Sequence, residues 1–223
     1  MLIEPGSDER VIITGQTGSG KTFLARQLLD GVKRLVVLDP KGMLRSPSPD
    51  EAEYGDIENW KLREWSETTE KLLKEGEPVR VRVPAPINGK WDEYLWAVYR
   101  AGNCVLYIDE VYGVVPPGKR PPEPLNAIYT RGRELGIGAV GVSQRPSWIP
   151  LEIMSEAEWY FCFRLMLDTD RRRMAEFMGM EVVSRITDRY GFWTYNVHWD
   201  EPVYTEQLEV ETKRSSQRKE KAS

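Results

Sequence analysis

The segment from residue 15 to residue 22 reads GQTGSGKT and restricts the fold more than any other part of the chain. An apolar run of strand length, residues 10–14, precedes it, and a helical pattern, residues 21–29, follows it. In this context glycines let backbone amides turn toward a phosphate, and the helix dipole adds positive potential. The other interpretation is a glycine turn that merely precedes a helix. Because the lysine and the threonine are both in place, we predict a phosphate-binding loop (P-loop) in an α/β fold.

The side chains of this segment have distinct predicted roles. Lys21 is long enough to reach the β- and γ-phosphates of a bound nucleotide, and the hydroxyl of Thr22 suits Mg²⁺, which prefers oxygen ligands. Backbone amides along the segment would hold the β-phosphate. The predicted nucleotide-binding residues are Gly15, Gln16, Thr17, Gly18, Ser19, Gly20, Lys21 and Thr22.

Two adjacent carboxylates, Asp109 and Glu110, follow the apolar strand pattern of residues 104–108. Ligands of open α/β sheets bind at the carboxyl ends of the strands. Asp109 would hold Mg²⁺ through water, and Glu110 would act as the general base for the attacking water. The alternative for the pair alone is an acidic strand end that caps the next turn. Behind a P-loop, the catalytic interpretation is favoured.

Gln144 follows a third apolar run, residues 138–143, and is predicted to sense the γ-phosphate or the lytic water. A glutamine at a strand end usually just faces solvent. This assignment therefore depends on the two other motifs.

Strand-length apolar runs alternate with helical patterns, which indicates βα units and a mainly parallel sheet. Aromatic segments at residues 190–197 and 203–208 predict a closing β-hairpin. Asn88 and Asp168 are each expected to cap a helix. A loop rich in proline and glycine follows Glu110. The predicted strands are residues 10–14, 34–39, 79–83, 104–108, 138–143 and 159–165, and the predicted helices are residues 21–29, 67–74, 88–100, 124–135 and 168–178.

The chain has 223 residues, of which 40% are hydrophobic and 30% charged, and this suits one large folded domain. The formal net charge of −4 argues against a whole-surface nucleic-acid binder. Residues 212–223, in contrast, carry a net charge of +4. We therefore predict a P-loop ATPase domain over residues 1–211 and a basic, disordered tail over residues 212–223.

Cys104 and Cys162 lie in apolar runs, which predicts buried, reduced thiols in a cytosolic protein. No segment approaches the ~20 apolar residues that a membrane-spanning helix needs. The first ten residues are too polar for a signal peptide. We therefore expect a protein that does not span a membrane.

Together the motifs resemble the FtsK–HerA superfamily of P-loop motor ATPases. The likeness is carried by GQTGSGKT, LVVLDPKG, LYIDE, RGRELGIGAVGVSQRP and FCFRL, within residues 11–179. Few residues precede the first strand, so the chain is most similar to the compact genome-packaging ATPases of membrane-containing icosahedral viruses. The resemblance implies an ASCE-type, RecA- and FtsK–HerA-like P-loop NTPase fold, a central and mainly parallel sheet flanked by helices, and ATP with Mg²⁺ as ligands.

The resemblance also implies a homo-oligomeric ring, typically hexameric, in which an arginine of the neighbouring subunit completes each site. By position Arg133 is the first candidate, Arg131 the second and Arg82 a further one. For each, a surface charge or an ion-pair partner is the alternative. Asp39 and Lys41 match the superfamily's DPKG pattern and are expected to shape the nucleotide pocket.

The implied function is ATP-driven translocation of double-stranded DNA into a preformed viral capsid, in the host cytoplasm or on the virion. A capsid vertex or internal membrane components would be docking partners. DNA contacts are expected at Lys119 and Arg120, although a solvated loop tip fits them equally. Two other functions stay open. One is a cellular or plasmid HerA- or conjugation-type DNA translocase, and the other is a P-loop assembly or secretion factor that acts on protein.

Overall fold

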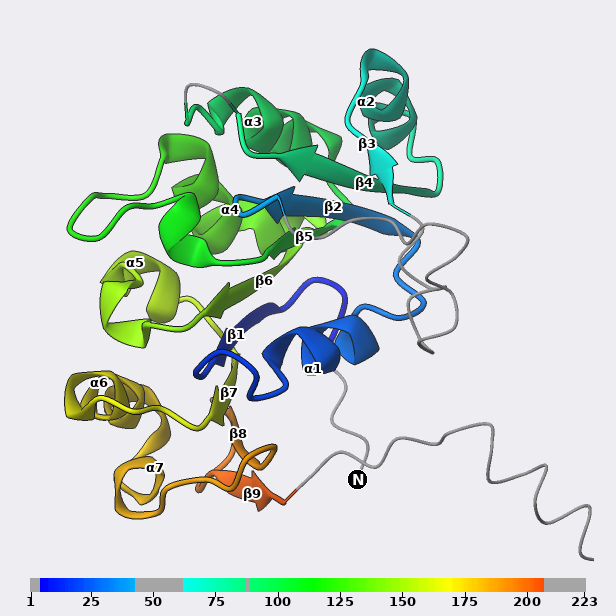
Figure 1. The fold of residues 1–223 in the computed structure, drawn as a ribbon. Coiled ribbons are helices and arrows are strands. Elements are labelled where there is room, and N and C mark those ends of the chain that lie inside the picture. Colours follow the sequence, from blue (N-terminus) through cyan, green and yellow to red (C-terminus); the bar gives the residue numbers. More distant parts are fainter. Residues whose placement is uncertain (1–4, 43–61, 87–88, 207–223) are drawn as a thin grey trace, which may run out of the picture.

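A computed structural model of the chain describes residues 5–42, 62–86 and 89–206. In the described residues one twisted sheet runs through the molecule (Figure 1). Its strands are β1 (Arg10–Thr14), β2 (Arg34–Asp39), β3 (Arg63–Glu64), β4 (Val79–Pro84), β5 (Val105–Ile108), β6 (Gly138–Ser143), β7 (Trp159–Phe163), β8 (Phe192–Asn196) and β9 (Val203–Thr205). The spatial order of the nine strands is β3-β4-β2-β5-β6-β1-β7-β8-β9.

The sheet is parallel from β3 to β7, and β8 and β9 add an antiparallel hairpin at one side. This confirms the predicted mainly parallel sheet with a closing hairpin. In the register of the strands, Thr14 at the end of β1 pairs with Ser143 at the end of β6, and Leu38 of β2 pairs with Ile108 at the end of β5. The carboxyl ends of these four strands therefore lie at one edge of the sheet.

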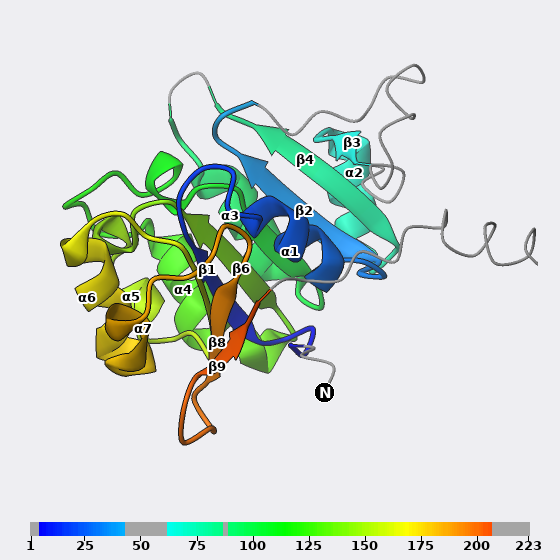
Figure 2. The same cartoon turned by 60° about the horizontal axis from the view of Figure 1, so that its bottom comes forward.

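Helices cover the two faces of the sheet unequally. They are α1 (Lys21–Leu28), α2 (Glu67–Lys74), α3 (Asp92–Ala101), α4 (Glu123–Arg131), α5 (Leu151–Met154), α6 (Asp168–Met178) and α7 (Glu181–Ser184). The helix α1 packs on one face, and α3, α4, α5 and α6 lie on the other (Figures 1 and 2). Short 3₁₀ turns occupy Val111–Gly113, Gly132–Leu135 and Pro146–Trp148.

Two hydrophobic clusters fix this arrangement, because successive strand side chains point to opposite faces. Ile12 of β1 packs in the cluster beneath α3 and α4, whereas Val11 and Ile13 pack with Leu24 of α1. All four side chains are buried. Strands covered on both faces read as continuous apolar runs, which is how β1, β2 and β5 stood out in the sequence.

Two predicted helix ends need correction. The helix expected over residues 124–135 begins at Glu123, and its α-helical part ends at Arg131, where the chain tightens into the 3₁₀ turn. A Cβ at Gly132 would lie 3.3 Å from Cβ of Ile137, so there is little space for a larger residue where the turn begins. Asp168 does not cap α6: Leu167 is the N-cap, and Asp168 is the first helical residue and pairs with Arg171 three residues on.

Other differences concern short or undescribed segments. The predicted cap Asn88 and the predicted tail at residues 212–223 lie outside the described residues, and α3 begins at Asp92. The elements β3, α5 and α7 were not predicted, because two to four residues are too few to show a periodicity. Cys104 and Cys162 are buried and unbridged, as predicted. No helix within the described ranges has the length and apolar character needed to cross a membrane.

Candidate nucleotide site

The P-loop connects β1 to α1 at the carboxyl edge of the sheet (Figure 1). Gly15, Gly18 and Gly20 have φ angles of 150°, 75° and 107°, a region that disfavours other residues. At Gly15 space is also lacking, since a Cβ there would lie 2.5 Å from Cβ of Phe163. The sequence therefore needs glycine at these positions to bend the loop in front of α1.

Lys21 lies inside this loop with only 7% of its surface exposed, and its Nζ donates a hydrogen bond to the Gln16 carbonyl at 2.8 Å. Burial lowers the pKa of Lys21 from 10.5 to about 8, and the negative charge of Glu110 partly opposes this shift. The hydroxyl of Ser19 is buried with no hydrogen-bond partner. A buried ammonium and an unsatisfied hydroxyl in a glycine-rich turn before a helix fit an incoming phosphate.

Asp109 and Glu110 follow the carboxyl end of β5. The amide of Asp109 donates to the Leu38 carbonyl at 3.1 Å, and its Oδ1 accepts a 2.8 Å hydrogen bond from the Tyr107 hydroxyl. Glu110 is 1% exposed and has a φ of 121°, which is unusual for a residue with a side chain. Both carboxylates are therefore held in defined positions beside the P-loop.

Two donors engage the carboxylate of Glu110. Lys41 Nζ donates to Oε2 at 3.0 Å, and the backbone amide of Gln144 donates to Oε1 at 3.2 Å. Partial burial opposes the charge of Lys41, but the hydrogen bond and the attraction to Glu110 raise the pKa of Lys41 above its ordinary value. Lys41 is therefore protonated at neutral pH and presents a positive charge to the carboxylate.

Gln144 also contacts the P-loop, because its Oε1 accepts a 2.9 Å hydrogen bond from the Thr17 hydroxyl. The strand order explains this contact, since β6 lies between β1 and β5. A continuous chain of hydrogen bonds thus links Thr17, Gln144 and Glu110. The structure brings the three sequence motifs together at one place.

Thr22, at the start of α1, and Asp109 are the candidate Mg²⁺ ligands. The described residues contain no group of three or more His, Cys, Asp or Glu side chains that would form a complete metal cage. Mg²⁺ is usually held by one or two carboxylates together with substrate phosphates. A hydroxyl and one carboxylate beside a phosphate loop fit that mode of binding.

Arg82 of β4 is engaged within its own chain. Its Nε and Nη2 each lie 2.8 Å from Oδ2 of Asp39, and its Nη1 lies 2.6 Å from Glu64. Asp39 is fully buried. In the DPKG segment the aspartate therefore binds an arginine of the neighbouring strand.

Arg133 and Arg131 lie away from their own P-loop. The side chain of Arg133 is 57% exposed, 3.5 Å from Glu158 and 3.7 Å from Asp8. It precedes β6 and contacts residues that precede β1 and β7, so it lies at the amino edge of the sheet. Arg131 is exposed, with its guanidinium 6.0 Å from the centre of the Tyr99 ring.

Lys119 and Arg120 are exposed on the loop between the Val111–Gly113 turn and α4. The anchored start of this loop explains its position, since Val111, Val114 and Val115 are buried in the core. The two basic side chains are thus presented to solvent by a loop that begins at Glu110.

Sequence reasoning missed three contacts in the site: Lys41 with Glu110, Tyr107 with Asp109, and Arg82 with Asp39. The sequence contains a signal for the contact between Lys41 and Glu110, because both residues follow the end of a predicted strand. That signal identifies a contact only once β2 and β5 are known to be neighbours.

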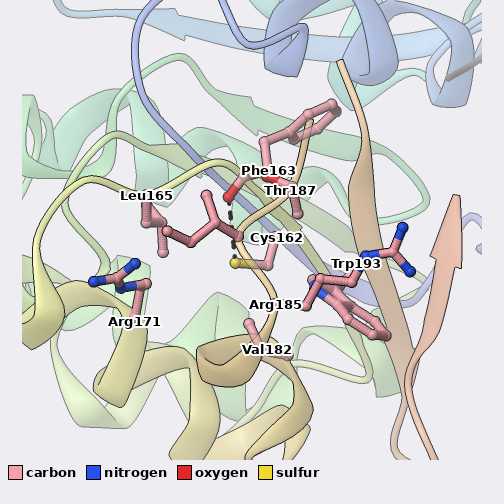
Figure 3. A pocket seen from close by; sticks show the side chains of 9 residues that line it. Cys162, Phe163, Leu165, Arg171, Val182, Arg185, Thr187 and Trp193 are labelled. Carbon is pink, nitrogen blue, oxygen red and sulfur yellow. Dashed lines mark hydrogen bonds between the residues drawn. The ribbon is translucent and has the colours of Figure 1, made fainter. Parts of the chain in front are cut away.

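Figure 3 shows a small hollow that is lined by residues of β7, α6, α7 and β8 and of the loops between them. Its wall includes Cys162, Leu165, Val182 and Trp193, and the Cys162 thiol donates to the Phe163 carbonyl at 3.5 Å. A larger open groove lies beside α1 toward the amino ends of the strands. Neither hollow includes a P-loop residue.

Comparisons with known proteins agree with this geometry. No protein-family model matches the sequence. The DNA packaging ATPase P9 of Enterobacteria phage PRD1 is 26% identical over 182 residues, which cover 80% of this chain and 74% of that protein.

Solved structures show the same fold. The genome packaging NTPase B204 of Sulfolobus turreted icosahedral virus 2, in complex with AMPPCP, superposes with a TM-score of 0.70 at 17% identity, covering 92% of this chain and 100% of that one. The pCW3 conjugation coupling protein TcpA gives a TM-score of 0.55 at 14% identity, covering 90% of this chain and 60% of that one. These findings confirm the predicted P-loop fold and the predicted resemblance to compact genome-packaging ATPases.

Proposed function

We propose that this chain is an ATP-hydrolysing motor that translocates double-stranded DNA and packages a viral genome into a preformed capsid. The observation that carries the proposal is the contact of three motifs at one sheet edge: Gln144 accepts a hydrogen bond from Thr17 of the P-loop and donates one to Glu110, whose charge acts on Lys21. The homologous packaging ATPase of phage PRD1 and the packaging NTPase fold support it.

ATP is the substrate in this proposal. The P-loop amides and Lys21 bind its phosphates, and the carboxylate of Glu110 accepts a proton from the water that attacks the γ-phosphorus. Gln144, whose Oε1 is within reach of the P-loop, orients that water. Thr22 and Asp109 would hold Mg²⁺, which neutralises charge on the phosphates.

An arginine from a neighbouring copy completes the site in a homo-oligomeric ring, which we propose to be hexameric. Arg133 is favoured over Arg82, because Arg82 is bound to the buried Asp39. Arg133 is more exposed and lies at the sheet edge opposite its own P-loop, so it can serve only the site of another subunit. Arg131 is the second choice.

A mixing experiment tests this arrangement. Arg133→Ala should lose about 10³-fold in ATP turnover, as loss of an arginine finger does. Glu110→Gln should also lose about 10³-fold, because a general base contributes ~10²–10⁴-fold. An equal mixture creates interfaces that combine an intact Arg133 with an intact Glu110, and turnover should partly return. A mixture as inactive as its components contradicts action in trans, and normal turnover by Arg133→Ala removes Arg133 from the site.

DNA is proposed to contact Lys119 and Arg120 on the loop that begins at Glu110, so that a change at the site can reach the DNA. Docking to a capsid vertex or to internal membrane components would place the motor on the virion; before docking it would lie in the host cytoplasm. The proposed ATPase domain is residues 1–211.

The direct test of function measures ATP turnover with and without double-stranded DNA. A packaging motor should turn over faster with DNA, and Lys119→Ala/Arg120→Ala should weaken that response while leaving DNA-free turnover unchanged. No response to DNA would favour an assembly or secretion factor acting on protein.

The second candidate is a conjugation-type translocase, favoured by the fold shared with TcpA. Packaging of DNA into purified empty capsids separates the two, since a conjugation-type motor translocates DNA without filling them.

A further inference from the structure

We infer that Lys41 is a positioning residue that holds the carboxylate of Glu110 in its orientation toward the attacking water. The inference rests on the proposed function and assigns a role within the same site. Lys41, the lysine of the DPKG segment, would then have a role in catalysis in addition to the expected role of shaping the nucleotide pocket.

Strand order and register bring the two residues together. The strands β2 and β5 are parallel neighbours, with Leu38 opposite Ile108, and each continues directly into a turn. In one turn the Gly42 amide donates to the Asp39 carbonyl at 3.1 Å, and in the other the Gly113 amide donates to the Glu110 carbonyl at 3.0 Å. Glu110 and Lys41 therefore lie on two adjacent turns, each closed by its own backbone hydrogen bond.

These two turns pack against each other without spare room. A Cβ on Gly113 would lie 2.5 Å from Cβ of Pro40, so the second turn needs glycine where it meets the first. The ring of Trp91 supports the same turn, since its Nε1 donates to the Gly113 carbonyl at 3.3 Å. Lys41 thus directly follows a residue that packs against the turn of Glu110.

Glu110 requires such support because of its backbone. Its φ of 121° lies in a region that residues with a Cβ adopt only when their surroundings impose it. Its side chain is 2% exposed, and both oxygens are occupied: Oε2 by Lys41 and Oε1 by the Gln144 amide. The carboxylate consequently has one orientation.

Lys21 is not an equivalent partner for Glu110. Its ammonium is directed to the Gln16 carbonyl at 2.8 Å, whereas the ammonium of Lys41 is 3.0 Å from the carboxylate. The side chain of Lys41 is also 34% exposed, so it reaches the carboxylate from the solvent side. During hydrolysis the water oxygen bonds to the γ-phosphorus as the β–γ bridging P–O bond breaks, and the water proton passes to Glu110. Lys41 keeps its own protons throughout.

Lys41→Met keeps the length of the side chain and removes the charge and the donors. Because misplacing a catalytic group by about 1 Å can cost ~100-fold, we expect kcat to fall by about 10- to 100-fold. The dissociation constant of a fluorescent ATP analogue should change less than about threefold, since the P-loop is untouched. Lys41→Arg, which keeps a charged donor, should recover most of kcat.

The matched control is Lys33→Met, which removes an exposed lysine just before β2, at the other end of the same strand. Its kcat should equal that of the unmodified protein. Thermal unfolding of each variant monitors the fold, and Lys41→Gln, which keeps a neutral donor, serves if Lys41→Met is unstable. Lys41→Gln should then show an intermediate kcat, and a kcat equal to that of the unmodified protein overturns the inference.

A double variant separates positioning from direct contact with phosphate. If Lys41 acts through Glu110, Lys41→Met should lower kcat no further in a Glu110→Gln background. An additive loss, or an unchanged kcat in Lys41→Met alone, overturns the inference. Failure of the proposed function looks different, because it appears in the unmodified protein, as turnover that does not respond to DNA or as no turnover at all.

Discussion

Replacement of Lys21 by methionine should make the nucleotide-free protein more stable while abolishing nucleotide binding. In the folded chain the ammonium is 7% exposed, and burial lowers the pKa of Lys21 from 10.5 to about 8. Each unit of such a shift corresponds to about 1.4 kcal/mol, so the charged lysine destabilises the fold by about 3 kcal/mol at neutral pH. Methionine fills the same space without a charge to desolvate.

The dependence on pH follows from proton binding. Below pH 8 the lysine is protonated in both states, and the full penalty is present. Between about pH 8 and pH 10.5 the folded protein has lost this proton and the unfolded chain retains it, so stability rises with pH. The difference in stability between Lys21→Met and the unmodified protein should therefore shrink as the pH rises from about 8 to about 10.5.

Thermal unfolding at pH 7 and at pH 10, without nucleotide and with EDTA, measures both effects. For a chain of this size ~3 kcal/mol corresponds to a rise in Tm of roughly 6–12 °C at pH 7, and ATP should raise the Tm of the unmodified protein only. Lys33→Met is the control and should not change Tm. An equal or lower Tm for Lys21→Met at pH 7, or a difference that is the same at both pH values, refutes the reasoning.

Three further predictions follow from individual contacts. Asp39→Ala should lower the free energy of unfolding by about 3 kcal/mol, because it leaves Arg82 without its buried partner. Glu64→Ala, which removes the exposed partner of Arg82, should lower it by less than about 1 kcal/mol. Equal losses in urea denaturation would contradict this difference. Gly113→Ala places a Cβ 2.5 Å from that of Pro40 and should reduce ATP turnover at least about tenfold with nucleotide binding retained; unaltered turnover speaks against the packed turns. Burial raises the pKa of Cys104 to about 11 and that of Cys162 to about 12. A thiol reagent at pH 8 should therefore label neither cysteine in the native protein and both cysteines in urea. Rapid labelling of the native protein would contradict the burial of these thiols.

The sequence predicted the parts of the site that depend on local order along the chain. A P-loop requires a strand before it and a helix after it, and GQTGSGKT has both. The carboxyl ends of parallel strands share one edge, so the acids after β5 and Gln144 after β6 were expected near the P-loop. Continuous apolar runs identified those strands, because they are buried on both faces.

Contacts that depend on strand order were not predictable from one sequence. Lys41 meets Glu110 because β2 and β5 are neighbours, and Asp39 meets Arg82 because β4 flanks β2 on its other side. Neither adjacency is encoded in a local pattern. The early end of α4 at Arg131 has a similar origin, since the close approach of Gly132 to Ile137 is a tertiary contact.

The central claim is that Glu110 is the base that activates water at a triphosphate held by the P-loop. Equilibrium binding of ATP and steady-state turnover, measured side by side on the unmodified protein and on Glu110→Gln, test it most directly. Binding should be retained while turnover is lost. Turnover at the unmodified rate in Glu110→Gln would contradict the claim.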